Sequence, residues 1–351
     1  MIYQYSGVVH VHTSYSDGSA DFKGIAKAAY KSGAKFILIN DHDTLDGLHQ
    51  QGEQYLHEVL VLVGAEVSPR QNHFLCYDIS SVPCKKQQPA KYVEQVYEQG
   101  GFGFLAHPDQ KENTIFRGSM HWDNWDLDMP VGLEIWNYFS QWMTSFESIR
   151  GLLISFLFPK AILSPPQPET LQKWDLLGEL RPVPAIAGVD AHGGRQFGWI
   201  PNILSSYRYQ FKTLRTHILS KEPLQGIVQN DRKIILSAIK SGRSYLVNHF
   251  AGHVKEFFFY LQHLNDKWHM GEEVMHRSGM TLNVILPEKA HLKLIKDGKV
   301  FLQSCTKAIQ LPDPEPGVYR VEVYKGCIWR RPWIFSNHIY VRPDPDSGYS
   351  S

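Results

Sequence analysis

Apolar runs of strand length alternate with helix-like segments through the first 250 residues, and this alternation restricts the fold more than any other feature. The expected strands cover residues 8–12, 36–39, 59–63, 73–77, 102–106, 131–135, 183–189 and 244–247. The expected helices cover 22–30 (ending at Gly33), 46–57, a segment from Pro89 to Gly100, and 231–240. Strands that alternate with helices predict a parallel α/β sheet or barrel.

Histidines and carboxylates fall in these strands or just after them. His10 and His12 share one strand, where residues i and i+2 face the same way. Glu66, His107, Asp190 and His192 follow later strands. In α/β barrels the carboxyl ends of the strands meet where chemistry takes place. The order of these residues therefore predicts one polar site, although core histidines or, at Asp17, a simple turn would also fit single positions.

The 351-residue composition is ordinary for a soluble globular protein, except for its 17 histidines. A net charge of +1 argues against an extended nucleic-acid surface. The four cysteines have no metal-binding spacing and are expected to be free thiols. No signal peptide or transmembrane segment is visible, so we expect a cytoplasmic protein. We also expect its partner to be a small-molecule substrate. Whether it forms a homo-oligomer is left open.

Two regions depart from the alternation. Residues 137–182 form an insertion in which Trp142, Phe146, Ile149, Leu153 and Phe156 recur at helical spacing. This pattern predicts one helix that packs on the barrel, or else a lid, a dimer contact or a membrane-surface patch. From residue 254 to 343, strands follow one another without helices (257–261, 280–286, 292–296, 317–324, 333–341), which predicts a small antiparallel β-sandwich. Residues 344–351 are expected to form a flexible tail.

Seven motifs occur in a fixed order along the chain. They are His-x-His at 10–12, Ser-Asp-Gly at 16–18, Asn-Asp-His-Asp-Thr at 40–44, Gly-Ala-Glu at 64–66 followed by His73, Ala-His-Pro at 106–108, and Gly-Val-Asp-Ala-His at 188–192. The ordered set resembles the polymerase and histidinol phosphatase (PHP) superfamily over residues 7–250. The insertion and residues 331–337 look like the carbaryl hydrolase-like branch, in which Pro is expected where this chain has His338.

The resemblance implies a distorted (β/α)7 barrel, residues 1–250, that holds two to three divalent metal ions. His10, His12, Glu66 and Asp190 would bind the first ion. Glu66 would bridge to a second ion held by His73 and His107. Asp17, His42 and His192 would hold a third. Asp41, Asp43, Glu134 and Asn137 are expected to support the ligands rather than bind metal.

The chemistry of this set agrees with the resemblance. Nitrogen and oxygen donors without thiolate suit Mn, Zn or Fe, and a carboxylate between two ions allows a bridging hydroxide to act as the nucleophile. We therefore expect a metal-dependent phosphoesterase that acts on a small phosphorylated substrate or nucleotide. His10, His12, Glu66, Asp190 and His192 would form its catalytic group, and Arg195 would bind the substrate's anion.

Two other interpretations stay open from the sequence. A hydrolase of carboxylic esters, amides or carbamates would use the same centre, and the apolar insertion favours it. A non-catalytic regulatory protein that retains the barrel is disfavoured, because every ligand position is filled.

Overall fold

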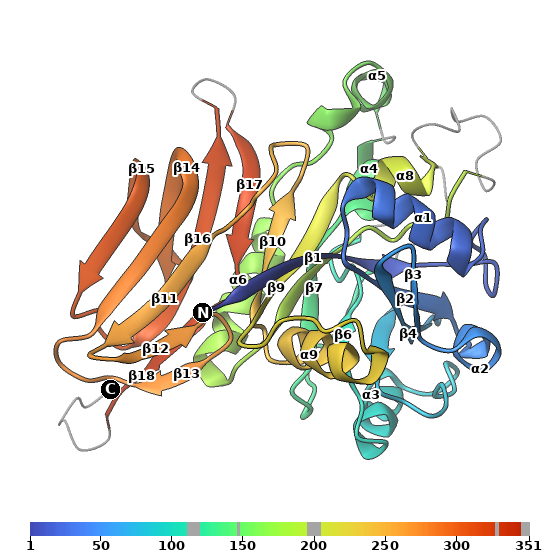
Figure 1. Cartoon of the computed structure of the whole chain (residues 1–351), viewed down its shortest axis with the longest axis horizontal. Helices are drawn as coiled ribbons and strands as arrows, with labels where there is room; N and C mark the ends of the chain where they lie inside the picture. The colour runs from blue at the N-terminus through green and yellow to red at the C-terminus, as the bar shows by residue number, and fades with distance from the viewer. Residues whose placement is uncertain (111–119, 146–147, 195–204, 327–329, 345–351) are drawn as a thin grey trace.

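The computed structural model describes residues 1–110, 120–145, 148–194, 205–326 and 330–344. It is a mixed α/β fold in which the helices gather around the N-terminal strands and the C-terminal strands form a separate layered region (Figure 1). The N-terminal strands are β1 (Tyr3–Val11), β2 (Phe36–His42), β3 (Gln54–Leu56), β4 (Val59–Val67), β5 (Phe74–Tyr77), β6 (Phe102–Leu105), β7 (Gly132–Asn137), β8 (Ala185–Gly188), β9 (Leu214–Ser220) and β10 (Ser244–Asn248).

The described helices are α1 (Phe22–Ser32), α2 (Asp46–Gln51), α3 (Pro89–Glu98), α4 (Tyr138–Ser145), α5 (Ile149–Leu157), α6 (Pro168–Leu180), α8 (Tyr207–Gln210) and α9 (Val228–Lys240), with a 3-10 turn at Pro159–Ala161. Helix α1 shows how capping residues in the sequence set the two ends of a helix. Asp21 caps its first turn by accepting a hydrogen bond from the Gly24 amide, and Gly33 ends it with a φ of 82°. Among the described helices, none is long and apolar enough to cross a membrane.

Seven N-terminal strands pair in a ring. Strands β1, β2 and β4 are parallel, as are β6, β7 and β8, and β5 lies antiparallel between β4 and β6. The ring closes where the segment after β8 returns to β1: the His12 amide donates to the Ala191 carbonyl at 2.9 Å. The antiparallel β5 departs from the expected all-parallel order, because residues 68–73 are too few for a crossover connection.

The ring strands are buried on both faces. In β2, Phe36 and Leu38 belong to one apolar cluster, and Ile37 and Ile39 belong to another. A strand covered on both sides has no polar face, which explains the continuous apolar runs in the sequence. The ends of these strands are consequently the main places where polar side chains can collect.

The C-terminal strands are β11 (Phe258–His263), β12 (Asp266–His269), β13 (Glu273–Met275), β14 (Thr281–Lys296), β15 (Lys299–Pro312), β16 (Gly317–Lys325), β17 (Arg331–Ser336) and β18 (Ile339–Arg342). They pair mostly antiparallel, and β17 also pairs antiparallel with β10 of the N-terminal part. Only β13 and β18 pair in parallel among the described C-terminal strands.

Several expected elements were wrong in their extent. The helix expected at 46–57 ends at Gln51, because Gly52 has a φ of 67° and the chain then forms β3 against β4. The single insertion helix is divided into α4 and α5, because the Ser148 hydroxyl accepts from the Gly151 amide and begins a new helix. Helix α6 and strand β9 were not expected.

The C-terminal strand predictions also need correction. The two strands expected at 280–286 and 292–296 are one strand, β14, which stays paired with β15 on both sides of an irregularity between Ile285 and Ala290. Strand β15 was missed because most of its side chains are exposed on both faces, so it shows no apolar alternation. The strand expected at 333–341 is interrupted at Asn337 and His338, whose side chains bond to the N-terminal part.

Candidate metal centre

All nine predicted ligand residues lie together at one edge of the ring, where the parallel strands end and the antiparallel β5 begins. Three groups have ligand atoms within 4.8 Å of one another: His12, Asp17, His42 and His192; His10, Glu66 and His107; and His10, His12 and Asp190. His73 joins them through Glu66, with its Nδ1 atom 2.9 Å from Oε1. The predicted convergence of these side chains is thus observed.

The backbone reaches this arrangement through irregular strands. His10, His107 and Asp190 have φ values of 64°, 29° and 51°, which are uncommon for residues other than glycine. The pairing of β1 with β2 shifts register between Val8 and Val11, and that of β7 with β8 shifts beside Glu134. Such bulges redirect side chains near functional sites.

The reasoning that placed His10 beside His12 therefore needs correction. A left-handed residue interrupts the extended alternation on which the i, i+2 argument depended. The two rings still lie with centroids 5.1 Å apart, and both are fully buried. The same applies to Asp190 and His192, which follow β8 instead of lying in a regular strand.

Glu66 is the centre of the group. Its Oε2 atom lies 3.4 Å from His10 Nε2, 3.5 Å from His12 Nε2 and 3.0 Å from His42 Nδ1. Its Oε1 atom lies 2.9 Å from His73 Nδ1 and 3.4 Å from His107 Nε2. Each carboxylate oxygen thus faces a different set of imidazoles, which is the arrangement that a bridging ligand needs.

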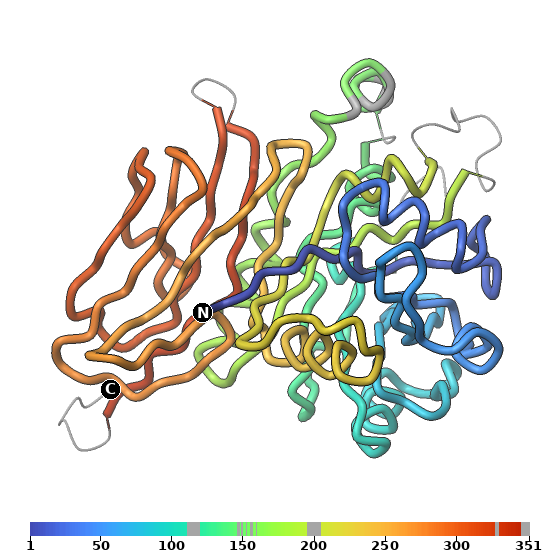
Figure 2. The backbone as a smooth tube through the Cα atoms, viewed as in Figure 1, coloured from blue at the N-terminus to red at the C-terminus, as the bar shows by residue number. Residues whose placement is uncertain are grey.

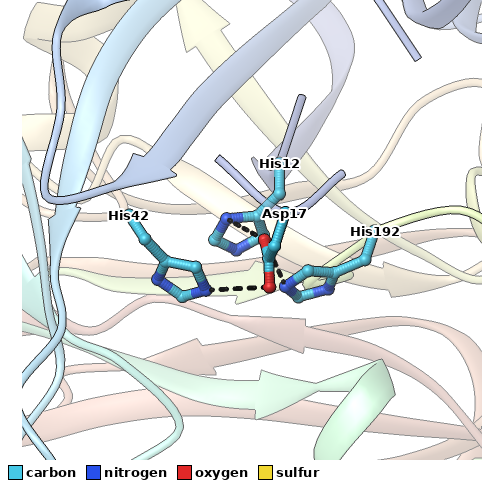
Figure 3. A group of neighbouring side chains, drawn as sticks. All are labelled: His12, Asp17, His42 and His192. Atoms are coloured by element: carbon cyan, nitrogen blue, oxygen red, sulfur yellow. Dashed lines mark ion pairs between the residues drawn. The ribbon is translucent and has the colours of Figure 1, made fainter. Parts of the chain in front are cut away.

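The group is open to solvent on one side. Figure 3 shows Asp17 between three imidazoles, with Oδ1 3.4 Å from His192 Nε2 and Oδ2 3.6 Å from His42 Nε2. The side chains of Asp17 and His42 are 43% and 26% exposed, whereas His10, His12 and Glu66 are fully buried. A substrate would therefore meet Asp17 and His42 first.

Glu134 fixes the orientation of His10. Its Oε1 atom accepts from His10 Nδ1 at 2.8 Å, so the other ring nitrogen of His10, Nε2, faces Glu66 and Asp190. Its Oε2 atom accepts from the His107 amide at 2.7 Å and from Asn137 Nδ2 at 2.9 Å. Glycine at 188 is required here, because a Cβ atom at that position would collide with the Glu134 carboxylate.

His73 is oriented in a similar way. The Pro69 carbonyl can only accept, so the 2.8 Å contact with His73 Nε2 places the proton on that nitrogen. His73 Nδ1 lies 2.9 Å from Glu66 Oε1, so a neutral His73 would direct its lone pair toward a cation bound to that carboxylate.

Other side chains hold the loop that carries Asp17. Asp41 accepts from the Thr13 amide and hydroxyl, both at 2.7 Å, and from the Ser16 hydroxyl at 2.6 Å, in the supporting role expected for it. The Tyr207 hydroxyl lies 2.8 Å from the His12 carbonyl oxygen. Tyr207 was missed, and nothing in its sequence context marks it. Arg195, the predicted anion-binding residue, lies outside the described residues.

The electrostatics of the buried group follow from its carboxylates. Burial alone would lower the pKa of His10, but Glu134, Asp190 and Glu66 raise it well above its ordinary value. Burial, together with His192 and His42, holds the pKa of His12 well below its ordinary value, so that this imidazole is neutral and able to donate its lone pair. Against the effect of burial, histidines hold the pKa of Glu66 well below its usual range.

These side chains fit divalent cations. Buried atoms of the group have no hydrogen-bond partner: His10 Nε2, both ring nitrogens of His12, Glu66 Oε2 and His107 Nδ1. Unpartnered buried polar atoms are costly and rare in folded proteins. The donors are nitrogen and oxygen without sulfur, a set that suits Mn, Fe or Zn.

Comparisons with known proteins give distant relatives. No family model matches the chain. It is 26% identical over 112 residues to an uncharacterized protein of Methanocaldococcus jannaschii, an alignment that covers 28% of this chain and 66% of that protein, just under two thirds of its length.

Two solved structures are similar at low TM-scores. One is a two-domain protein from Bacteroides vulgatus that contains a predicted PHP-like metal-dependent phosphoesterase (TM-score 0.44, 16% identity, 97% of this chain and 95% of that chain). The other is an amidohydrolase from Chromobacterium violaceum (TM-score 0.31, 13% identity, 54% and 88%). Likeness at this level does not assign a function.

Replacing Glu134 with Gln is expected to weaken metal binding without unfolding the protein. The amide keeps the shape of the carboxylate but loses its charge, so His10 is oriented less firmly. Loss of such a supporting partner typically lowers metal affinity by about 10–100-fold. Titration of the metal-free protein with Mn²⁺ measures this change, with Glu94→Gln on the surface as the control. Equal affinities for the Glu134 variant and the native protein would contradict the role given to Glu134.

Removing metal is expected to lower the stability of the fold. Ions that bind only the folded state stabilise it by about 2.7 kcal/mol at a free concentration a hundred times the dissociation constant. Denaturant unfolding of chelator-treated protein, with and without added Mn²⁺, measures this difference. Identical unfolding curves would show that the centre does not bind Mn²⁺ in the folded state.

Proposed function

We propose that this protein is a metal-dependent hydrolase of the PHP superfamily. The observation that carries the proposal is the Glu66 carboxylate, whose two oxygens face separate sets of imidazoles within a group of nine potential ligands. We further propose that the seven-stranded ring, with its antiparallel member, corresponds to the distorted (β/α)7 barrel of that superfamily. The C-terminal strands would then form its second domain.

The nine candidate ligands would hold up to three ions. Glu66 would bridge two ions, with His10, His12 and Asp190 on one side and His73 and His107 on the other. Asp17, His42 and His192 would hold a third ion at the open side. Bound there, divalent ions supply a Lewis acid that lowers the pKa of water and neutralises charge on the group under attack.

The protein's own side chains would keep this centre in order. Glu134 holds the His10 ring and the backbone at His107, and the Pro69 carbonyl holds the His73 ring. Asp41 holds the turn that presents Asp17. Because the interior half of the group is fully buried, water and substrate would enter only from the side of Asp17 and His42.

We propose phosphoester hydrolysis of a small phosphorylated molecule or nucleotide as the reaction. Several divalent ions close together can neutralise the oxygens of a transferring phosphoryl group. One observation favours the alternative, hydrolysis of a carboxylic ester, amide or carbamate. The centroid of the Phe139 ring lies 5.5 Å from that of His192, so an apolar side chain borders the ligand group.

The deciding experiment compares three substrates on the same metal-quantified sample: a bis-aryl phosphate, an aryl monophosphate and an aryl carbamate, each with added Mn²⁺. Phosphate turnover with two to three bound ions, as the three ligand groups require, supports the phosphoesterase. Carbamate turnover alone supports the alternative. Absence of bound metal would refute both. His49→Ala, which removes an exposed histidine outside the group, is the control.

A further inference from the structure

Lys85 lies beside the open side of the candidate metal centre. It belongs to the segment between β5 and α3, which Figure 2 shows on the same side of the protein as α2. Its Nζ atom is 2.6 Å from Oδ2 of Asp43, the residue that directly follows the candidate ligand His42. The side chains of Lys85 and Asp43 are 48% and 26% exposed. A cation from a separate segment is therefore held next to the part of the centre that solvent reaches.

Ser68 connects this ion pair to the centre. The Ser68 amide donates to Asp43 Oδ1 at 3.0 Å, and the Ser68 hydroxyl lies 2.6 Å from His42 Nδ1. The Asp43 amide also donates to the Glu66 carbonyl at 2.8 Å. The Asp43 carboxylate and the His42 ring thus bond to the same residue, while Lys85 bonds to the other carboxylate oxygen. Only Asp43 separates the ammonium group from a candidate ligand imidazole.

The ion pair between Lys85 and Asp43 can open at little cost. Exposed ion pairs contribute little to stability, because water and salt screen the two charges. Lysine carries its charge on a flexible stem with three rotatable donors, and it binds phosphate as a point charge. If Lys85 turned toward a bound anion, Asp43 would keep its hydrogen bond from Ser68. Lys85 is therefore free to exchange a protein carboxylate for an anion at the open side.

We propose that Lys85 binds an anionic oxygen of the substrate and thereby favours charged substrates over neutral ones. This inference rests on the proposed function, because it requires a substrate held at the open side by Asp17, His42 and the ions there. Without substrate, Asp43 keeps the ammonium group beside the centre. Lys85 would contribute to binding and not to the chemical step, so its loss should raise KM and leave kcat unchanged.

A purely structural role for Lys85 predicts a different result. If the lysine only held Asp43 in place, its removal would loosen Ser68 and His42, and the affinity of the centre for metal would fall. If Lys85 binds the substrate, the affinity for metal stays native and only the affinity for anions falls. Measuring both affinities on the same variant separates the two roles.

The test uses the variant Lys85→Ala of the full chain, loaded with Mn²⁺, and inorganic phosphate as the probe. In isothermal titration calorimetry, phosphate should bind about tenfold more weakly than to the native protein, because one charge-assisted hydrogen bond is lost. KM for an aryl monophosphate should rise by a similar factor at unchanged kcat. Lys85→Arg, which keeps the charge, should restore most of both. Titration of the metal-free variant should give native Mn²⁺ affinity.

The matched control is Lys86→Ala, which removes the exposed lysine next in the chain and should behave as the native protein does. Native phosphate affinity and native KM in Lys85→Ala would overturn the proposal. A fall in Mn²⁺ affinity large enough to account for the weaker phosphate binding would overturn it as well. A native protein that binds Mn²⁺ but neither binds phosphate nor hydrolyses phosphate esters would refute the phosphoesterase function and this proposal with it. That outcome is seen in the native protein, before any variant is made.

Discussion

Replacing Glu66 with Gln is expected to abolish turnover and to remove bound metal from more than one position. The amide has nearly the volume of the carboxylate but carries no charge, so it cannot bridge two cations or balance the five histidines around it. If the ions supply several kcal/mol of transition-state stabilisation, the rate falls by about a thousandfold or more. Metal analysis and turnover of the preferred substrate, measured on one preparation, check both parts.

The control for this experiment is again His49→Ala, which should keep its metal and its rate. Circular dichroism separates loss of metal from loss of fold. A Glu66→Gln protein with full metal content and native turnover would disprove the bridging role. Loss of metal with native turnover would disprove the metal-dependent mechanism itself.

Replacing Asp175 with Ala is expected to destabilise the folded protein by about 3–5 kcal/mol, the cost of breaking a buried ion pair. Asp175 of α6 accepts from Arg320 Nε at 2.7 Å and from Nη2 at 2.8 Å, and His338 Nε2 lies 2.8 Å from its Oδ1. All three side chains are buried, so the variant would leave the Arg320 guanidinium with Glu322, whose Oε1 atom lies 2.6 Å from Nη1, and without its bidentate partner. Denaturant unfolding measures the loss, and Glu179→Ala, an exposed carboxylate of the same helix, should show almost none.

The same cluster predicts a dependence of stability on pH. Burial alone would raise the pKa of Asp175, but its hydrogen bonds with Arg320 and His338 hold it at about 2, below its ordinary value of 3.8. A lowered folded-state pKa contributes stability that is complete above pH 4 and is lost as the pH falls from about 4 to 2. This pH-dependent contribution to the free energy of unfolding amounts to about 2 kcal/mol. It should be missing from Asp175→Asn, so unfolding curves of the two proteins that stay parallel between pH 5 and 2 would contradict it.

His338 makes contacts that could not be predicted from the sequence. The position was notable only because proline was expected there, and its neighbours in sequence gave no reason for the difference. The structure supplies one, since the ring contacts Trp174 and bonds to Asp175, a residue 163 positions earlier in the chain. Side-chain contacts over such separations leave no local pattern of the kind that periodicity detects.

The convergence of the ligand side chains could be predicted because most of them lie at or just after the end of an apolar strand, and because the ordered motifs resemble those of one family. What could not be predicted is how the backbone presents them. The bulges beside His10 and Glu134, and the left-handed φ of Asp190, depend on the pairing of strands far apart in the sequence. Tyr207 also could not be predicted from the sequence. Its hydroxyl contacts the His12 carbonyl, and no sequence motif marks a contact of this kind.

The side chain of Asn337 makes hydrogen bonds with backbone groups that a neighbouring strand would otherwise make. Its side-chain amide accepts from the Ala185 amide at 2.7 Å and donates to the carbonyls of Ala185 and Ser244 at 2.9 and 3.0 Å. A residue of the C-terminal part thereby completes the backbone hydrogen bonds at the start of β8, the strand that leads to Asp190. Together with the β10–β17 pairing, these hydrogen bonds connect the C-terminal part to the N-terminal part at two places. We expect a chain shortened before β11 to lose these hydrogen bonds, so that the start of β8 is held less firmly.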